Sequence, residues 1–148
     1  MSRKFVTQRD EFECTYLMPL DDEGHAVLRA HRYRVEFTVA SKSTLTDGQD
    51  VLIDFDKLSN YIKCILPNRS FLYNRSAYGT SAENSIAAEY AKYKIPVVGY
   101  MFTPSAENLA DHFARNLQEV FDSMFENIEV VEVKLRESTN SYATWKAN

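Results

Sequence analysis

The sequence has few cysteines and no long apolar run, and each absence excludes a class of protein. Cys14 and Cys64 are too few for a disulfide scaffold, and neither belongs to a C-x-x-C motif. We expect both to be reduced thiols that pack as small hydrophobic side chains. The N-terminus has no apolar run of signal-peptide length, and no segment approaches the roughly 18 apolar residues of a membrane span. The sequence therefore predicts a cytoplasmic protein.

A basic stripe is also missing. The net charge is -4 and residues of both signs are scattered along the chain, so we expect no nucleic-acid partner and no membrane partner. What is present is ordinary for a globular protein. The 148 residues are 45% apolar and 26% charged, which suits one domain with a sizeable core over residues 1–148.

The first half of the chain alternates between strand and helix patterns. Period-two alternation predicts a strand at Phe12 to Leu17 and a clearer one at His31 to Val39. A helical stripe begins at an Asp54 cap and ends before Pro67. A further helix is expected over Ser81 to Lys94, although residues 68–102 as a whole are harder to assign.

The second half contains the longest helical stripe. A short strand at Val97 to Phe102 precedes it, Thr103 is its expected cap, and Pro104 is its expected first residue. Ile128 to Ser138 reads as a strand that continues through a hairpin into Tyr142 to Trp145. Together these elements predict an α+β fold, an antiparallel β-sheet with two or three helices on one face.

The strand IEVVEVKLRES places one carboxylate among apolar side chains. By alternation, Val131, Val133, Leu135 and Glu137 share a face. A carboxylate that faces a core needs a partner to offset its desolvation, such as an arginine, backbone N–H groups or a ligand with two parallel donors. The alternative is that Glu137 lies in water at the end of the strand. The segment alone leaves both possibilities open.

Six segments follow one another in an order that covers about nine-tenths of the chain: FECTY, EGHAVLRAHRYRVEF, DGQDVLIDFDKL, LPNRSFLYN, TPSAEN and VEVKLRES. This order resembles the 6-pyruvoyl-tetrahydropterin synthase and 6-carboxy-tetrahydropterin synthase family, which has the tunnelling fold. No single motif is specific, but six in the right order are hard to obtain by chance. The resemblance implies a single tunnelling-fold domain that assembles into an oligomeric barrel, a homohexamer of two trimers with ligand pockets between subunits.

The resemblance also shows what this chain has replaced. In the family three histidines bind zinc, and the matching positions here are Tyr16, His31 and Tyr33. A phenol has a reference pKa near ~10 and is an uncommon zinc ligand, so we expect no metal and no other cofactor. His31 is then expected to be a hydrogen-bonded pocket residue. The family's catalytic cysteine falls at or next to Val27, and its Asp-His relay falls at Pro67 and Asn68, so no catalytic residue is assigned.

The residue by which the family recognises its ligand has a counterpart in this chain. The family binds pterins and purines through a buried glutamate that accepts two parallel N–H bonds, and Glu137 occupies that position. Ser105 is a second candidate ligand contact and Glu107 a weaker one, although capping of a helix explains Ser105 equally simply.

Two functions of different classes follow. The first is a pterin-binding or purine-binding protein that lacks the synthase activity. The second is an active lyase that processes a dihydroneopterin triphosphate-like substrate in a rebuilt site.

Overall fold

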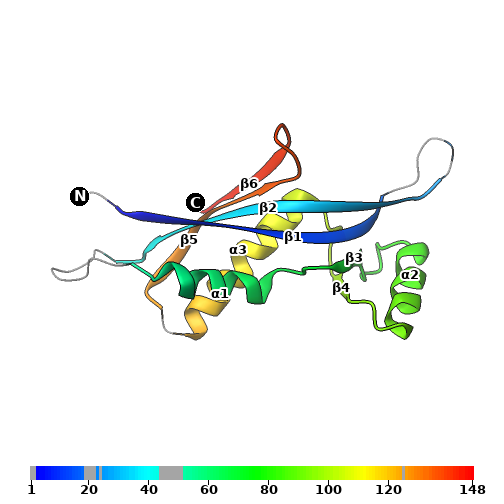
Figure 1. Cartoon of the computed structure of the whole chain (residues 1–148), viewed down its shortest axis with the longest axis horizontal. Coiled ribbons are helices and arrows are strands. Elements are labelled where there is room, and N and C mark those ends of the chain that lie inside the picture. The colour runs from blue at the N-terminus through cyan, green and yellow to red at the C-terminus, as the bar shows by residue number, and fades with distance from the viewer. Residues whose placement is uncertain (1–2, 19–22, 24, 44–51, 125) are drawn as a thin grey trace.

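The computed structural model describes residues 3–18, 23, 25–43, 52–124 and 126–148. Within these residues the chain forms a six-stranded sheet and three helices (Figure 1). The strands are β1 (Phe5–Met18), β2 (Val27–Ser41), β3 (Ser70–Asn74), β4 (Val97–Tyr100), β5 (Ile128–Arg136) and β6 (Tyr142–Lys146). The helices are α1 (Phe55–Ile65), α2 (Ser81–Lys92) and α3 (Ala106–Ser123).

The sheet has the strand order β4-β3-β1-β2-β5-β6. Its central and C-terminal part, formed by β1, β2, β5 and β6, pairs antiparallel, which confirms the predicted α+β class. The short strands β3 and β4 extend it in parallel: β3 lies parallel to β1, and β4 lies parallel to β3. The strand predicted at Val97 to Phe102 is confirmed as β4, but the sequence predicted neither β3 nor the parallel pairing. Parallel neighbours need a crossover connection, and α2 supplies it between β3 and β4.

Both long strands exceed their predicted bounds. β1 starts at Phe5 rather than Phe12 because its first half pairs with β2 over the full register. Polar pairs hold that half together, with the Arg9 guanidinium 2.6 Å from the Glu36 carboxylate and the Thr7 and Thr38 hydroxyls 2.8 Å apart. A strand stabilised by cross-strand polar pairs shows no apolar alternation, so the sequence pattern missed it.

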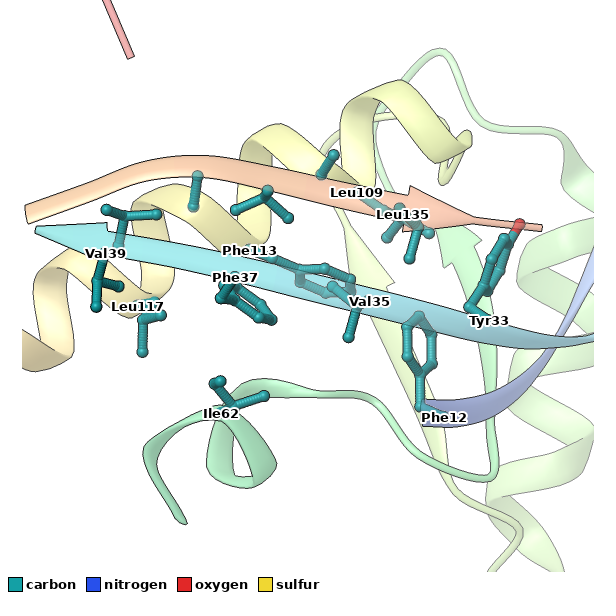
Figure 2. Close-up of a cluster of buried hydrophobic side chains, with 14 of the residues drawn as sticks. Phe12, Tyr33, Val35, Phe37, Val39, Ile62, Leu109, Phe113, Leu117 and Leu135 are labelled. Atoms are coloured by element: carbon teal, nitrogen blue, oxygen red, sulfur yellow. The ribbon is translucent and has the colours of Figure 1, made fainter. Parts of the chain in front are cut away.

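The core lies between one face of the sheet and two helices, α1 and α3 (Figure 2). Leu58 and Ile62 of α1 are fully buried there, as are Phe113 and Leu117 of α3. Phe12 of β1 meets the Phe113 ring edge to face, with the centroids 5.5 Å apart. Cys14 is buried on the same face, but Cys64 is exposed on α1, so the expectation that both cysteines pack inside is wrong for Cys64. No helix in the described part of the chain is long and apolar enough to cross a membrane.

The ends of the helices follow from local hydrogen bonds. The Asp54 cap is confirmed, since its carboxylate accepts from the Asp56 N–H at 2.7 Å. For α3 the predicted Thr103 cap is wrong. Ser105 is the cap, because its hydroxyl accepts from the Asn108 N–H at 3.3 Å and Pro104 precedes the helix.

Helix α2 also ends earlier than predicted, at Lys92 rather than Lys94. Lys94 adopts a left-handed φ of 59°, which continues no right-handed helix. Its N–H donates to the Ala91 carbonyl at 3.1 Å, and the Ile95 N–H donates to the Tyr90 carbonyl at 3.0 Å. These two bonds form the Schellman ending of a helix and satisfy its last carbonyls.

A β-bulge changes which residues of β5 face the core. The register between β2 and β5 shifts at Thr38/Val39, so Val39 pairs with Val130 while Thr38 pairs with Glu132. Val131 is the extra residue and is only half-buried, whereas Val130 and Val133 are buried. The prediction that Val131 belongs to the buried stripe is therefore wrong. Beyond the bulge the alternation resumes, so the stripe from Val133 through Leu135 leads to Glu137 as predicted.

Gly79, in the turn between β3 and α2, has no room for a side chain. An added Cβ would lie 1.9 Å from the Asn74 carbonyl oxygen, a backbone atom that cannot rotate away. We expect Gly79→Ala to lower the free energy of unfolding by about 1–3 kcal/mol in urea denaturation. Gly99→Ala is the matched control, because its Cβ would meet side-chain atoms of Arg75 and Tyr73 that can move. An equal loss in both variants would contradict this explanation.

Candidate functional site

Four polar side chains from three strands gather at one end of the core: Tyr16 of β1, His31 and Tyr33 of β2, and Glu137 just after β5. We call them the His31 cluster. The His31 Nε2 atom lies 2.9 Å from the Glu137 Oε1 atom and 3.0 Å from the Tyr16 hydroxyl. The Tyr16 and His31 rings are stacked with their centroids 5.3 Å apart, and the Tyr33 ring lies 5.4 Å from that of His31.

The backbone explains why these residues meet. Cys14 pairs with His31 in the register between β1 and β2, which places Tyr16 two residues further along the same face. Arg34 pairs with Arg136 in the register between β2 and β5, so the next step along the strands brings Tyr33 opposite Glu137. Leu135 and Tyr33 are fully buried, and the cluster therefore continues the apolar stripe outward from the core.

Glu137 combines features of both sequence interpretations. It lies one residue past the end of β5, where its N–H donates to the Ser141 carbonyl at 3.0 Å, and its side chain is 37% exposed. It nevertheless lies on the core-facing side and has a partner, His31, whose side chain is only 16% exposed. An ionised carboxylate only accepts hydrogen bonds, so a bond between the two requires the His31 Nε2 to carry its hydrogen.

Burial keeps the phenols and the nearby thiol of this region protonated. Desolvation raises the pKa of Tyr16, and the negative charge of Glu137 raises it further. Desolvation also raises the pKa of Tyr33 well above its usual range and that of Cys14 to about 12. At neutral pH the cluster therefore presents two neutral phenols, and Cys14 is not a thiolate nucleophile.

These donors do not fit a zinc ion. Zinc takes neutral imidazoles, thiolates or carboxylates at tetrahedral positions. Here two of the three positions carry protonated phenols, and the one imidazole already contacts Glu137. Within the described residues, no group of three or more histidine, cysteine, aspartate or glutamate side chains is arranged to hold a metal. Absence of zinc from the protein itself stays a prediction.

The positions that match the family's catalytic groups have structural roles here. Val27 is the first residue of β2, pairs with Met18 and is 41% exposed. Pro67 is buried after α1. The Asn68 side-chain oxygen accepts from the Glu13 N–H at 3.0 Å, which ties the loop to β1. None of these groups exchanges a proton near neutral pH.

The α3 candidates do not join the cluster. Ser105 caps α3 through its hydroxyl, as the alternative interpretation proposed. Glu107 is exposed in the first turn of that helix. No hydrogen bond or ion pair between described residues connects either one with Glu137. A ligand role for both remains a prediction.

Residues 5–148 match the family model for 6-pyruvoyl tetrahydropterin synthase. The chain belongs to this family. The match covers every described element of the sheet and all three helices, so membership extends over the whole fold rather than over one motif. No curated protein sequence matches the chain significantly.

Solved structures share the fold at low sequence identity. A catalytic-residue mutant of 6-pyruvoyltetrahydropterin synthase from Plasmodium vivax superposes with a TM-score of 0.70 at 16% identity, covering 100% of this chain and 99% of that one. The 6-pyruvoyl tetrahydropterin synthase of Caenorhabditis elegans gives 0.61 at 14% identity, covering 100% and 98%. An uncharacterized protein from Wolinella succinogenes gives 0.68 at 14% identity with complete coverage of both chains. At such identities these likenesses establish the fold alone.

The contact between His31 and Glu137 was not predicted from the sequence. Both residues were candidates, but an arginine, backbone N–H groups or a ligand were the partners considered for the carboxylate. The signal was present in the alternation, because His31 shares a face with Tyr33 on β2 and Glu137 shares one with Leu135 on β5. Only the pairing register brings those two faces together.

Proposed function

We propose that this member of the 6-pyruvoyl tetrahydropterin synthase family binds a pterin-type or purine-type ring through Glu137 and does not perform zinc-dependent synthase chemistry. One observation carries the proposal: Glu137 is a carboxylate on the core-facing stripe, held by His31 and still 37% exposed. It is accessible to a ligand but fixed in direction.

The geometry of the carboxylate suits a ligand with two parallel donors. His31 contacts Oε1, and no described residue hydrogen-bonds Oε2. A carboxylate offers about four acceptor sites, so Oε1 retains a lone pair beside its contact with His31. The amino group and ring N–H of a guanine-like edge therefore have two acceptors available side by side. His31 would orient the anchor rather than compete with the ligand.

The proposed loss of chemistry rests on the character of the surrounding groups. Neutral phenols stand at two positions where the family places imidazoles, and Val27, Pro67 and Asn68 stand where it places proton-transfer groups. Proton transfer at carbon needs a titratable group in reach of the reacting atoms. Binding of the ring requires none of these groups, so it survives their replacement.

One contact favours a second candidate function, an active lyase with a rebuilt site. The Tyr16 hydroxyl and the Glu137 carboxylate both contact the His31 Nε2 atom. An imidazole is the side chain most often used as a general acid or base, so His31 would be the proton donor or acceptor for a bound substrate. This function acts on a dihydroneopterin triphosphate-like substrate and predicts turnover without zinc.

Calorimetric titration of the purified protein with neopterin, guanine and lumazine tests the binding proposal. Lumazine keeps the fused ring but carries an oxygen in place of the 2-amino group, so it lacks one of the two parallel donors. We expect neopterin or guanine to bind at least tenfold more tightly than lumazine. With lumazine bound, the carboxylate would be covered by the ligand while one of its oxygens had no hydrogen bond, and an unpaired buried acceptor costs free energy. Equal affinity for all three compounds, or no binding of any, would refute the proposal.

A homo-oligomer, a hexamer of two trimers, is expected from the exposed edges of the sheet. β4 and β6 lie at its two edges, and no described strand pairs with their outer sides. Unpaired edges invite pairing with another chain, and closing several sheets into a barrel removes them. Light scattering at micromolar concentration should therefore report a mass several times the 17.1 kDa of one chain. A monomer under these conditions would contradict the prediction.

A further inference from the structure

We propose that a second cavity, on the opposite face of the sheet from the His31 cluster, binds a small organic monoanion with an aromatic body. The cavity has a volume of about 540 Å³ and lies where α2 meets β1, β2 and β3. Pockets of roughly 300–1,000 Å³ are typical of small-molecule sites. His31 belongs to the cluster and also lines this cavity, whereas Glu137, Tyr16 and Tyr33 do not line it.

Alternation along the strands places most of the residues that line this cavity on the face of the sheet opposite the side chains of the cluster. Glu13 and Thr15 of β1 alternate with Cys14, so their side chains project to the face that does not carry the core. Thr15 pairs with Phe71 of β3, which shares that face. The Phe71 ring in turn meets the Tyr90 ring of α2 edge to face, with the centroids 5.4 Å apart. Helix α2 therefore covers the outer face, at the end of the molecule away from α1 (Figure 1).

The wall of the cavity carries one cation, Arg69, that is not held in an ion pair, although its charge helps to lower the pKa of the nearby Glu13 carboxyl group. Arg32 also lines it, but its guanidinium lies 2.5 Å from the Glu13 carboxylate, so that charge is neutralised. The Arg69 guanidinium forms no hydrogen bond or ion pair with any described residue. Its backbone is held in place, since the Arg69 N–H donates to the Glu13 carbonyl at 2.6 Å and its φ is 57°. The cavity thus offers one positive charge on an exposed side chain whose backbone is held in place.

The other residues that line the cavity indicate what kind of molecule would carry the negative charge. Phe71, Tyr90 and Ile95 provide an apolar wall with two aromatic rings. Thr15 and Tyr90 also line the cavity, and their hydroxyls hydrogen-bond no described residue. A planar ring would stack or pack against the aromatic wall, while its carboxylate would take the two parallel donors of the Arg69 guanidinium. One unpaired cation matches one negative charge, which favours a carboxylate over a phosphate dianion.

Titration with 2-naphthoate, with the neutral 2-naphthamide and with phenyl phosphate as comparison ligands, tests this assignment on the intact protein. We expect 2-naphthoate to bind at least tenfold more tightly than either. Arg69→Asn should reduce that affinity at least tenfold, since asparagine tolerates the left-handed backbone but lacks the charge. Arg115→Gln is the matched control, because Arg115 lies exposed on α3 and pairs with Asp111. It should leave the affinity unchanged.

Ile95→Glu provides a second variant in case Arg69→Asn unfolds the protein. Ile95 is 43% exposed, so the fold should accept the change, and the added carboxylate should repel the anion and abolish binding. Glu137→Gln should leave naphthoate binding intact, which separates this proposal from that for the pterin site. No binding of 2-naphthoate by the parent protein, as when a second copy of the chain covers the cavity, would overturn the proposal. Unchanged affinity in both Arg69→Asn and Ile95→Glu would do the same.

Discussion

Replacing Tyr16 and Tyr33 together by histidine is expected to convert a protein without stoichiometric zinc into one that binds about one zinc ion per chain. With His31 the two substitutions complete three imidazoles on one face of adjacent strands. The parent carries two phenols at these positions, and burial raises the pKa of both phenols and keeps them protonated. Phenols with a raised pKa must lose a proton at high cost before they can bind a metal.

The same double variant is expected to remain without synthase activity. A bound zinc ion supplies Lewis-acid polarisation, but proton transfer at the reacting carbons needs titratable groups that Val27, Pro67 and Asn68 do not provide. Each general acid or base typically contributes about 10²–10⁴-fold to the rate, so losing several leaves turnover near background. The double variant would therefore bind zinc without regaining synthase activity.

Metal analysis of purified parent and variant, followed by assays with dihydroneopterin triphosphate, measures both results. Tyr16→Phe with Tyr33→Phe is the matched control, since it changes the same positions without adding a ligand. Stoichiometric zinc in the parent would show that the phenols do not exclude the metal. Robust turnover by the parent, with or without zinc, would replace the binding proposal with the lyase and make His31 its first candidate acid or base.

Glu137→Gln is expected to weaken binding of a pterin or purine ring by about 2–4 kcal/mol, the range for breaking a charge-assisted pair that the ligand buries. The substitution replaces one acceptor oxygen with an NH₂ group that faces the donors of the ring. It also removes the charge that His31 contacts at 2.9 Å. Loss of this partly exposed pair should change the free energy of unfolding by less than about 1 kcal/mol.

Glu132→Gln is the matched control, because Glu132 lies on β5, the strand that leads to Glu137, but projects to the opposite face. Glu107→Gln tests the weaker candidate at the start of α3. Calorimetric titration of the three variants with neopterin or guanine separates the roles. Affinity in Glu137→Gln equal to that of the parent would show that Glu137 is not the anchor, and a loss confined to Glu107→Gln would move the anchor to α3.

Alternation and capping predicted much of the fold, because they depend on neighbours along the chain. His31 to Val39 lies entirely within β2, and the Asp54 cap begins α1 as expected. The same local rules failed where more than one residue could cap a helix. Either Thr103 or Ser105 could cap α3, and only the observed geometry places the Ser105 hydroxyl on the Asn108 N–H.

The sequence by itself determined that Glu137 continues an apolar stripe and that the matching zinc positions carry two phenols, since both follow from residue identity and the period of a strand. Only the tertiary structure decided that His31 is the partner of Glu137, that Val131 bulges out of the stripe, and that α2 covers the outer face beside Arg69. Each of these depends on the register between strands that are distant in the sequence. Register is set by the packing of whole faces against each other, and no single segment encodes it.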